Sequence, residues 1–269
     1  MYIEILIKDL SEADKEILIA NLSELAEGFE ETENTFKIYI KQEKFDTTEI
    51  KVLSEKLQFS YQIASIPNQN WNQLWESNFD PVIVNDFVAV RADFHQSEKN
   101  VEHEIVITPK MSFGTGHHAT TFLMMQQMRK IDFTGKSVFD FGTGTGILAI
   151  LAYKLGASRI LATDIDEWSI NNAQENFERN AISQIVLKQS DSAIQNETFD
   201  IILANINRNI LIETIPDLAK QLQKGGVLLL SGLLAVDEPD ILSVCDNNAL
   251  VLKESVQKEK WICLYFNKL

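Results

Sequence analysis

A glycine-rich turn between two apolar segments places the strongest constraint on the fold of this 269-residue chain. The segment Asp140-Phe-Gly-Thr-Gly-Thr-Gly146 follows the apolar residues of 137–139 and precedes a second apolar run at 147–151. This order predicts a strand, a tight turn and a helix. Glycines at such a turn let the backbone approach a ligand where a Cβ atom would clash. The helix directs its unpaired N–H groups toward that ligand.

An acidic residue, Asp164, ends the next predicted strand, about 20 residues after the turn, where a carboxylate can bind a ribose diol. The sequence therefore predicts a nucleoside-containing cofactor. The glycine spacing is G-x-G-x-G, and the chain has no G-x-x-x-x-G-K-[ST] phosphate loop. Asp140 repels phosphate but attracts a sulfonium or ammonium group, which favours S-adenosylmethionine. A dinucleotide site and a purely structural glycine turn remain the alternatives.

Strand and helix patterns alternate from about residue 110 to the end of the chain. Strands are predicted near 137–141, 160–164, 185–189, 200–204, 226–231, 249–256 and 261–267. Helices are predicted near 117–130, 147–155, 167–180, 208–223 and 238–247. This alternation predicts an α/β domain with a mainly parallel, doubly wound sheet. The last two strands follow each other directly, as in the antiparallel edge hairpin of the seven-stranded methyltransferase sheet.

Two further regions precede this domain. Residues 1–66 carry the order β-α-β-β-α-β, which predicts a small ferredoxin-like α+β domain. Residues 67–109 are expected to be a linker and connecting strands. They begin with an aromatic cluster around Trp71 and Trp75, which either packs the two domains together or forms ordinary local core. The expected domains are thus 1–66, 67–109 and 110–269.

The net charge of −15 argues against binding to a nucleic-acid backbone and is compatible with a basic protein partner. No apolar run is long enough to cross a membrane, and the N-terminus lacks the pattern of a signal peptide. The two cysteines, Cys245 and Cys263, show no metal-binding spacing and predict a reducing compartment. We therefore expect a cytoplasmic monomer without a metal ion.

Polar residues at the carboxyl ends of the predicted strands are candidates for the site, because ligands bind there in open α/β sheets. Asn205 follows the fourth strand of this domain and offers a carboxamide for the cofactor or for a substrate amine. Asp191, after the third strand, is a candidate for the adenine amino group. Thr121 lies in the first turn of a predicted helix, where its hydroxyl can face the cofactor. His117 and His118 precede it, and solvent or cap contacts are expected for them rather than metal binding or base catalysis.

Several stretches together resemble the ribosomal protein L11 methyltransferase family, PrmA. They are Met111-Ser-Phe-Gly-Thr-Gly-His-His-Ala-Thr-Thr121, Asp140-Phe-Gly-Thr-Gly-Thr-Gly-Ile-Leu148, Asp164-Ile-Asp166, Ala204-Asn-Ile206, Gly225-Gly-Val-Leu-Leu-Leu-Ser-Gly232, Asn70-Trp-Asn-Gln-Leu-Trp75 and Glu259-Lys-Trp261. Many methyltransferases share the glycine loop, whereas the first stretch is specific to the family. The resemblance covers nearly the whole chain.

The resemblance implies methyl transfer from S-adenosylmethionine to lysine ε-amines and the N-terminal α-amine of a large-subunit ribosomal protein, recognised by the N-terminal domain. It implies cofactor contacts at Thr121, Gly142, Gly144, Asp164, Ile165 and Asn205. From its charge and its place in the glycine turn, Asp140 is expected to contact the cofactor too, and Asn205 is also the expected catalytic residue. Trp168 and Ser169 stand where smaller apolar residues are common, which leaves the adenine-side wall in doubt. A related methyltransferase with another protein or small-molecule substrate, and a non-catalytic scaffold, are the alternatives.

Overall fold

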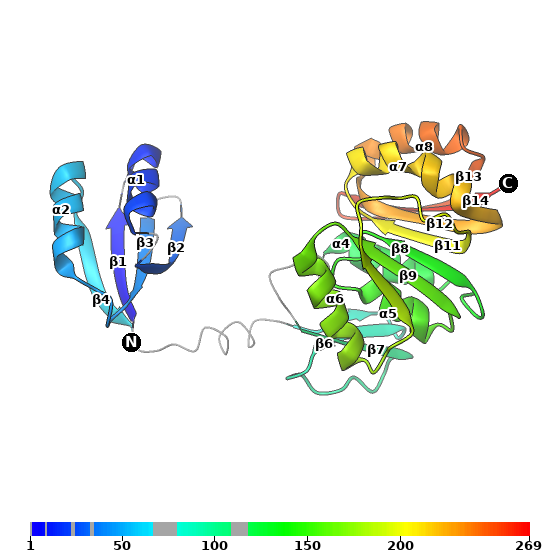
Figure 1. Ribbon diagram of the computed structural model, residues 1–269, viewed down its shortest axis with the longest axis horizontal. Helices are drawn as coiled ribbons and strands as arrows, with labels where there is room; N and C mark the ends of the chain where they lie inside the picture. The colour runs from blue at the N-terminus through cyan, green and yellow to red at the C-terminus, as the bar shows by residue number, and fades with distance from the viewer. Residues whose placement is uncertain (1, 9, 23–24, 33–34, 67–79, 109–117) are drawn as a thin grey trace. The chain divides into compact units, whose positions relative to one another are not determined.

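The computed structural model describes residues 2–8, 10–22, 25–32, 35–66, 80–108 and 118–269. The chain divides into two compact units, Met1–Phe79 and Asp80–Leu269. Figure 1 shows both units, with a four-stranded sheet in the first and a larger sheet between helices in the second. The aromatic cluster of 67–79 and the glycine stretch of 109–117 lie outside the described residues.

The smaller unit has the ferredoxin-like order that the sequence predicts. Its elements are β1 (Tyr2–Lys8), α1 (Glu12–Leu22), β2 (Ala26–Thr32), β3 (Thr35–Lys41), α2 (Thr47–Leu57) and β4 (Tyr61–Ile66). The strands form one antiparallel sheet in the order β2-β3-β1-β4. Alternate residues of β1 and β3 point to one face, so the apolar residues at every second position enter one core. The buried residues of that core are Ile3, Ile5, Ile7, Leu18, Leu22, Phe36, Ile38, Ile40, Ile50 and Leu53.

The larger unit contains a seven-stranded sheet in the order β10-β9-β8-β11-β12-β14-β13. Its strands are β8 (Ser137–Phe141), β9 (Arg159–Asp164), β10 (Ile185–Gln189), β11 (Phe199–Asn205), β12 (Leu222–Leu234), β13 (Leu250–Lys258) and β14 (Trp261–Lys268). The first five of these are parallel, and β14 pairs antiparallel with both β12 and β13. The predicted doubly wound sheet and its edge hairpin are thus confirmed. The strand order reverses between β8 and β11, where open α/β sheets bind their ligands.

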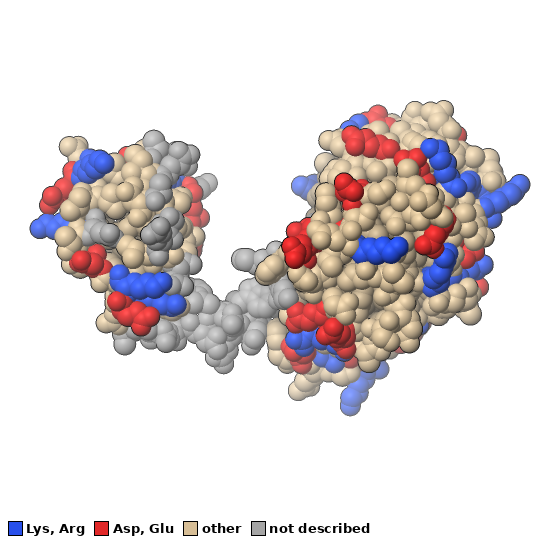
Figure 2. All heavy atoms as spheres, viewed as in Figure 1, with Lys and Arg blue, Asp and Glu red and all other residues tan. Residues whose placement is uncertain are grey.

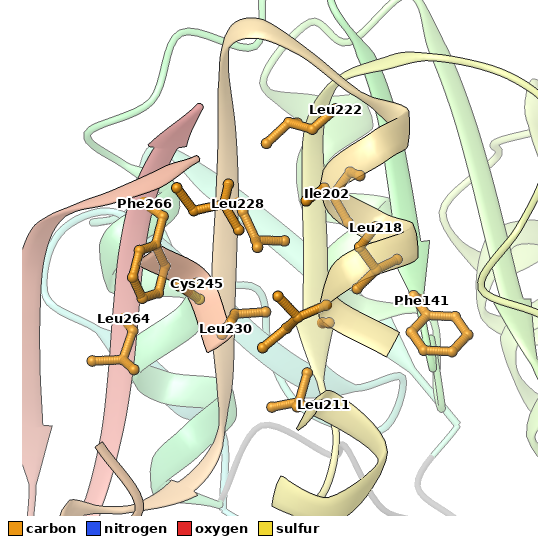
Figure 3. Close-up of a cluster of buried hydrophobic side chains, with 14 of the residues drawn as sticks. Phe141, Ile202, Leu211, Leu218, Leu222, Leu228, Leu230, Cys245, Leu264 and Phe266 are labelled. Atoms are coloured by element: carbon orange, nitrogen blue, oxygen red, sulfur yellow. The ribbon is translucent and has the colours of Figure 1, made fainter. Parts of the chain in front are cut away.

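Helices cover both faces of this sheet (Figure 1). They are α4 (Ala119–Met128), α5 (Ile147–Lys154) and α6 (Glu167–Arg179) on one face, and α7 (Arg208–Gln221) and α8 (Glu238–Asp246) on the other, with a short 3₁₀ turn, η1 (Ala235–Asp237), before α8. Figure 3 shows the core under α7 and α8. Its labelled side chains are Phe141, Ile202, Leu211, Leu218, Leu222, Leu228, Leu230, Cys245, Leu264 and Phe266.

A second, three-stranded sheet completes the larger unit. It contains β5 (Val82–Val84), β6 (Val88–Ala92) and β7 (His103–Ile107) in the order β5-β6-β7, and β6 and β7 run parallel. β7 contacts α5 and α6. These strands fall in the region that the sequence assigns to connecting structure, and the structure groups them with the larger unit.

The surface charges are mixed in sign on the visible face of the larger unit (Figure 2). Several charged side chains of this unit form ion pairs that join separate elements. Arg129 pairs with Asp86 and Glu102, and Arg179 pairs with Asp93. Among the described helices, none is both long and apolar enough to cross a membrane.

Candidate functional site

The glycine turn between β8 and α5 is fixed to the neighbouring strand by backbone hydrogen bonds. The N–H groups of Gly142 and Thr143 both donate to the carbonyl of Thr163, at 2.9 and 2.8 Å. Gly142 has φ +75°, and a Cβ atom there would lie 2.3 Å from Cγ2 of Ile206. The turn therefore needs glycine at this position both for its left-handed backbone and for its close contact with the loop after β11.

Asp164, at the end of β9, is oriented by the same turn. Its Oδ2 accepts a hydrogen bond from the backbone N–H of Gly144 at 2.8 Å, and its Oδ1 accepts one from Asp166 at 3.1 Å. A carboxylate has about four acceptor positions, so these two bonds fix the group and leave further positions for a ligand. Asp166 has a different task, because its carboxylate caps α6 by accepting from Ser169 N at 2.9 Å.

Asp140 lies fully buried at the end of β8, beneath the turn. Its Oδ2 accepts a 2.6 Å hydrogen bond from the hydroxyl of Thr143. Burial raises the pKa of this carboxyl to about 7, while the Thr143 bond lowers it and the charge of Asp164 raises it. The site thus contains a carboxyl that changes its charge near neutral pH.

This carboxyl predicts a pH dependence of stability. Its pKa is about 7 in the folded chain and 3.8 ordinarily, so its contribution is complete below pH 3.8 and is lost as the pH rises through 7. We expect the free energy of unfolding to fall in this interval by up to about 1.4 kcal/mol per pH unit. Asp140→Asn should remove this part of the decline in urea titrations, and Asp166→Asn, at an exposed cap, should not. Equal pH profiles for wild type and Asp140→Asn would contradict the prediction.

Asn205 is the last residue of β11, and a hydrogen bond to α4 fixes its side chain. Its Nδ2 donates to Oγ1 of Thr121, in the first turn of α4, at 3.3 Å. Thr121 is 2% exposed, and its hydroxyl oxygen accepts this bond. The carboxamide Oδ1 of Asn205 is buried and has no partner among the described residues. One N–H of Nδ2 is thus engaged, and Oδ1 remains as an acceptor for an N–H group.

The rings of His118 and Trp261 pack against each other in the site. Their rings lie 4.6 Å apart, centroid to centroid, in an edge-to-face arrangement. His118 is the N-cap of α4, and its Nδ1 accepts a hydrogen bond from the backbone N–H of Thr120. Burial lowers the pKa of His118, the charge of Glu259 raises it and that of Lys260 lowers it. A neutral imidazole in this position adds no positive charge to the site.

These elements surround one cavity of about 490 Å³. Five of the seven residues expected to contact the cofactor line it: Gly142, Gly144, Asp164, Ile165 and Asn205. Asp191, the candidate for the adenine contact, lines it as well, whereas Thr121 and Asp140 are buried and are not among the lining residues. His117 and the glycines before it lie outside the described residues.

The cavity also contains residues that the sequence analysis does not single out as site residues. They are Phe141, Ser190, Ile206, Asn207, Ile210, Gly232 and Trp261. A glycine within a strand signals close backbone approach, and this signal could have identified Gly232. Asn207 caps α7, and its place before a predicted helix is a second usable signal. Trp261 begins β14, and the sequence around it gives no local sign of its distant partner.

Among the described residues, the lining has acidic side chains at Asp164 and Asp191 and contains no lysine or arginine. Such a set favours a ligand with positive charge over one with phosphate groups. In the described part of the chain, no group of three or more His, Cys, Asp or Glu side chains is placed to hold a metal ion.

Comparison with known proteins gives matches along both units. A family model described as ribosomal protein L11 methyltransferase (PrmA) matches residues 5–269. A ribosomal protein L11 methyltransferase of Porphyromonas gingivalis is 40% identical over 260 residues, which cover 93% of this chain and 90% of that protein. Its counterpart from Bacteroides fragilis is 36% identical over 265 residues, 95% of each chain. The crystal structure of a ribosomal protein L11 methylase from Lactobacillus delbrueckii subsp. bulgaricus matches with a TM-score of 0.65 at 33% identity, and covers 71% of this chain and 100% of that one.

Proposed function

Since the chain belongs to the ribosomal protein L11 methyltransferase family, and is therefore a protein methyltransferase, we propose that it methylates ribosomal protein L11. The methyl donor is S-adenosylmethionine, and the acceptors are lysine ε-amines and the N-terminal α-amine. The reaction takes place in the cytoplasm, and the enzyme acts as a monomer without a metal ion.

One observation supports this proposal above the others. Asn205, whose buried Oδ1 has no partner among the described residues, lines the same cavity as the glycine turn and Asp164. A buried acceptor without a partner costs free energy unless a ligand supplies the hydrogen bond. An amine N–H satisfies it, and the acidic lining suits a cofactor that carries a sulfonium and an ammonium group. The residues present thus fit S-adenosylmethionine.

The cofactor residues act by binding and orienting. S-adenosylmethionine supplies a methyl group already activated by the positive sulfur. Asp164 would accept hydrogen bonds from the ribose hydroxyls, with its orientation fixed by Gly144 and Asp166. Gly142 and Gly144 allow close approach of the backbone, and Ile165 and Asp191 would contact the adenine side. Thr121 supports this arrangement through Asn205.

The acceptor amine must be neutral to attack. Deprotonating lysine at pH 7 costs about 4.6 kcal/mol, against about 1 kcal/mol for an α-amine, so the N-terminal amine is the easier nucleophile. Asn205 Oδ1 would accept one N–H of the amine and direct the nitrogen lone pair toward the methyl group. His118 uses Nδ1 to cap α4, so we assign the proton to water and propose no dedicated base.

Replacing Asp164 with asparagine tests the cofactor half of the site. Asparagine has one acceptor oxygen where the carboxylate has two, and hydrogen bonds to a charged acceptor are the stronger ones. We expect the Kd of S-adenosylmethionine, measured by calorimetry, to rise about tenfold or more. Asp166→Asn is the matched control, because it lies two residues away and asparagine also caps helices well. A variant Asp164→Asn with wild-type affinity would exclude the proposed ribose contact.

The direct test of function is transfer of labelled methyl groups into purified, unmodified ribosomal protein L11, followed by intact-mass measurement. The full chain and a version that begins near residue 67 are compared. We expect mass gain with the full chain only, because the ferredoxin-like unit is proposed to recognise the substrate. Binding of S-adenosylmethionine without any mass gain would refute L11 as the substrate and leave another protein or a small molecule as the acceptor.

A further inference from the structure

Two asparagines, one in α6 and one at its C-cap, bind the backbone along the free edge of the strand β7. Asn180 accepts from the backbone N–H of Val106 at 3.1 Å and donates to the Val106 carbonyl at 2.7 Å. One turn earlier, Asn176 accepts from the backbone N–H of Thr108 at 2.8 Å. The two side chains therefore take the place of a neighbouring strand at alternate residues of this edge.

Asn176 makes two additional hydrogen bonds that Asn180 lacks. Its Nδ2 donates to the backbone carbonyl of Thr145 at 2.8 Å and to Oδ1 of Asn172 at 3.2 Å. Asn176 is completely buried, and its acceptor and both of its donors have partners. A fully satisfied amide in the interior has one favourable orientation, so it fixes the positions of the groups that it binds.

The groups that Asn176 joins are adjacent in the chain to elements of the candidate cofactor site. Thr145 is part of the glycine turn, between Gly144 and the helix N-cap Gly146. Thr108 is the last described residue before the segment 109–117, which leads to His118 and Thr121. The contact of α6 with the turn is tight, because a Cβ atom at Gly146 would lie 2.6 Å from the ring of Phe177.

We propose that Asn176 is a positioning residue for cofactor binding. It holds the Thr145 carbonyl, and with it the glycine turn, at a fixed distance from the end of β7. The inference rests on the proposed function, because it takes S-adenosylmethionine as the ligand of the turn. Asn180 holds the same strand from the same helix but does not touch the turn, so its role is confined to the stability of the fold.

The test compares Asn176→Leu with Asn180→Leu in the full chain. Leucine is similar in size and makes no side-chain hydrogen bonds, so both variants lose their bonds to β7. Calorimetry gives the Kd of S-adenosylmethionine and of S-adenosylhomocysteine well below each unfolding temperature. We expect both variants to unfold more easily. Only Asn176→Leu should bind the two ligands more weakly, by about tenfold, and Asn180→Leu should stay within about twofold of wild type.

A second variant keeps the inference testable if Asn176→Leu does not fold. In Asn176→Asp an ionised carboxylate cannot donate to the Thr145 carbonyl, whereas a protonated one can. We therefore expect its affinity, relative to wild type, to recover as the pH is lowered from 8 to 6, a change that a purely structural role does not produce. Equal loss of affinity in the two leucine variants, or no pH-dependent recovery, would overturn the inference. Absence of binding by wild type would refute the proposed function instead.

Discussion

Asn205→Ala is expected to lower kcat about 100-fold. An effect of this size follows when the reacting amine is displaced by about 1 Å from its productive position. Asn205 is the last residue of β11, and its buried Oδ1, which has no partner in the described part of the chain, is the proposed acceptor for the attacking amine. Alanine removes the oxygen without disturbing the backbone of the strand. The amine then enters the cavity without the hydrogen bond that directs its lone pair. Single-turnover methyl transfer into L11 measures the effect on the chemical step.

Thr121, the hydrogen-bond partner of Asn205, supplies the control for this prediction. Thr121→Ser keeps the oxygen that accepts from Nδ2, whereas Thr121→Val removes it and releases the amide from its fixed orientation. We expect kcat to stay near wild type in the first variant and to fall in the second. The Kd of S-adenosylmethionine is measured in all three variants. A loss of cofactor affinity that accounts for the whole effect of Asn205→Ala would show that Asn205 serves the cofactor and not the amine.

Gly232→Ala is expected to destabilise the larger unit by about 3 kcal/mol and to abolish methyl transfer. Gly232 lies in β12 with φ +84°, and an added Cβ atom would be 2.1 Å from the carbonyl oxygen of Ile206. Because the obstacle is backbone, the loop after β11 must move away. That loop follows Asn205 directly, so the displacement reaches the proposed amine acceptor. Urea unfolding and methyl transfer measure the two effects.

Gly225 offers a matched control in the same strand. Its φ is +74°, and an added Cβ atom would have no other atom within 4 Å. Gly225→Ala should therefore lower the free energy of unfolding by only about 1 kcal/mol, through the strain of the left-handed backbone, and should retain methyl transfer. The difference between the two variants isolates the contact with Ile206. Equal destabilisation in both would mean that backbone conformation, and not this contact, explains the need for glycine at 232.

The strands and helices of the larger unit could be predicted because each has a local signal. β8, β9 and β11 are apolar runs of strand length, and caps such as Asp166 and Asn207 mark where helices begin. The small sheet β5-β6-β7 could not be predicted in the same way. Its short strands are visible at most as apolar runs, and the parallel pairing of β6 with β7 depends on contacts that no local pattern encodes.

The site shows the same division between local and distant information. Gly142, Gly144 and Asp164 follow from one motif and its spacing, and the structure brings them into one cavity. The hydrogen bond between Thr121 and Asn205 joins residues that are 84 positions apart in the chain. The pairing of His118 with Trp261 joins two elements even farther apart in the chain. Such contacts are set by how the helices pack on the sheet, which a single sequence does not specify.

The edge of β7 has a consequence for the order in which the chain is built. Its backbone groups at Val106 and Thr108 find their partners 74 and 68 residues later, at Asn180 and Asn176. During synthesis, which proceeds from the N-terminus, the small sheet therefore emerges with an open edge. An open strand edge can pair with another chain and start aggregation. Substitutions that delay the docking of α6 should lower the yield of soluble protein more than their effect on the finished fold would indicate.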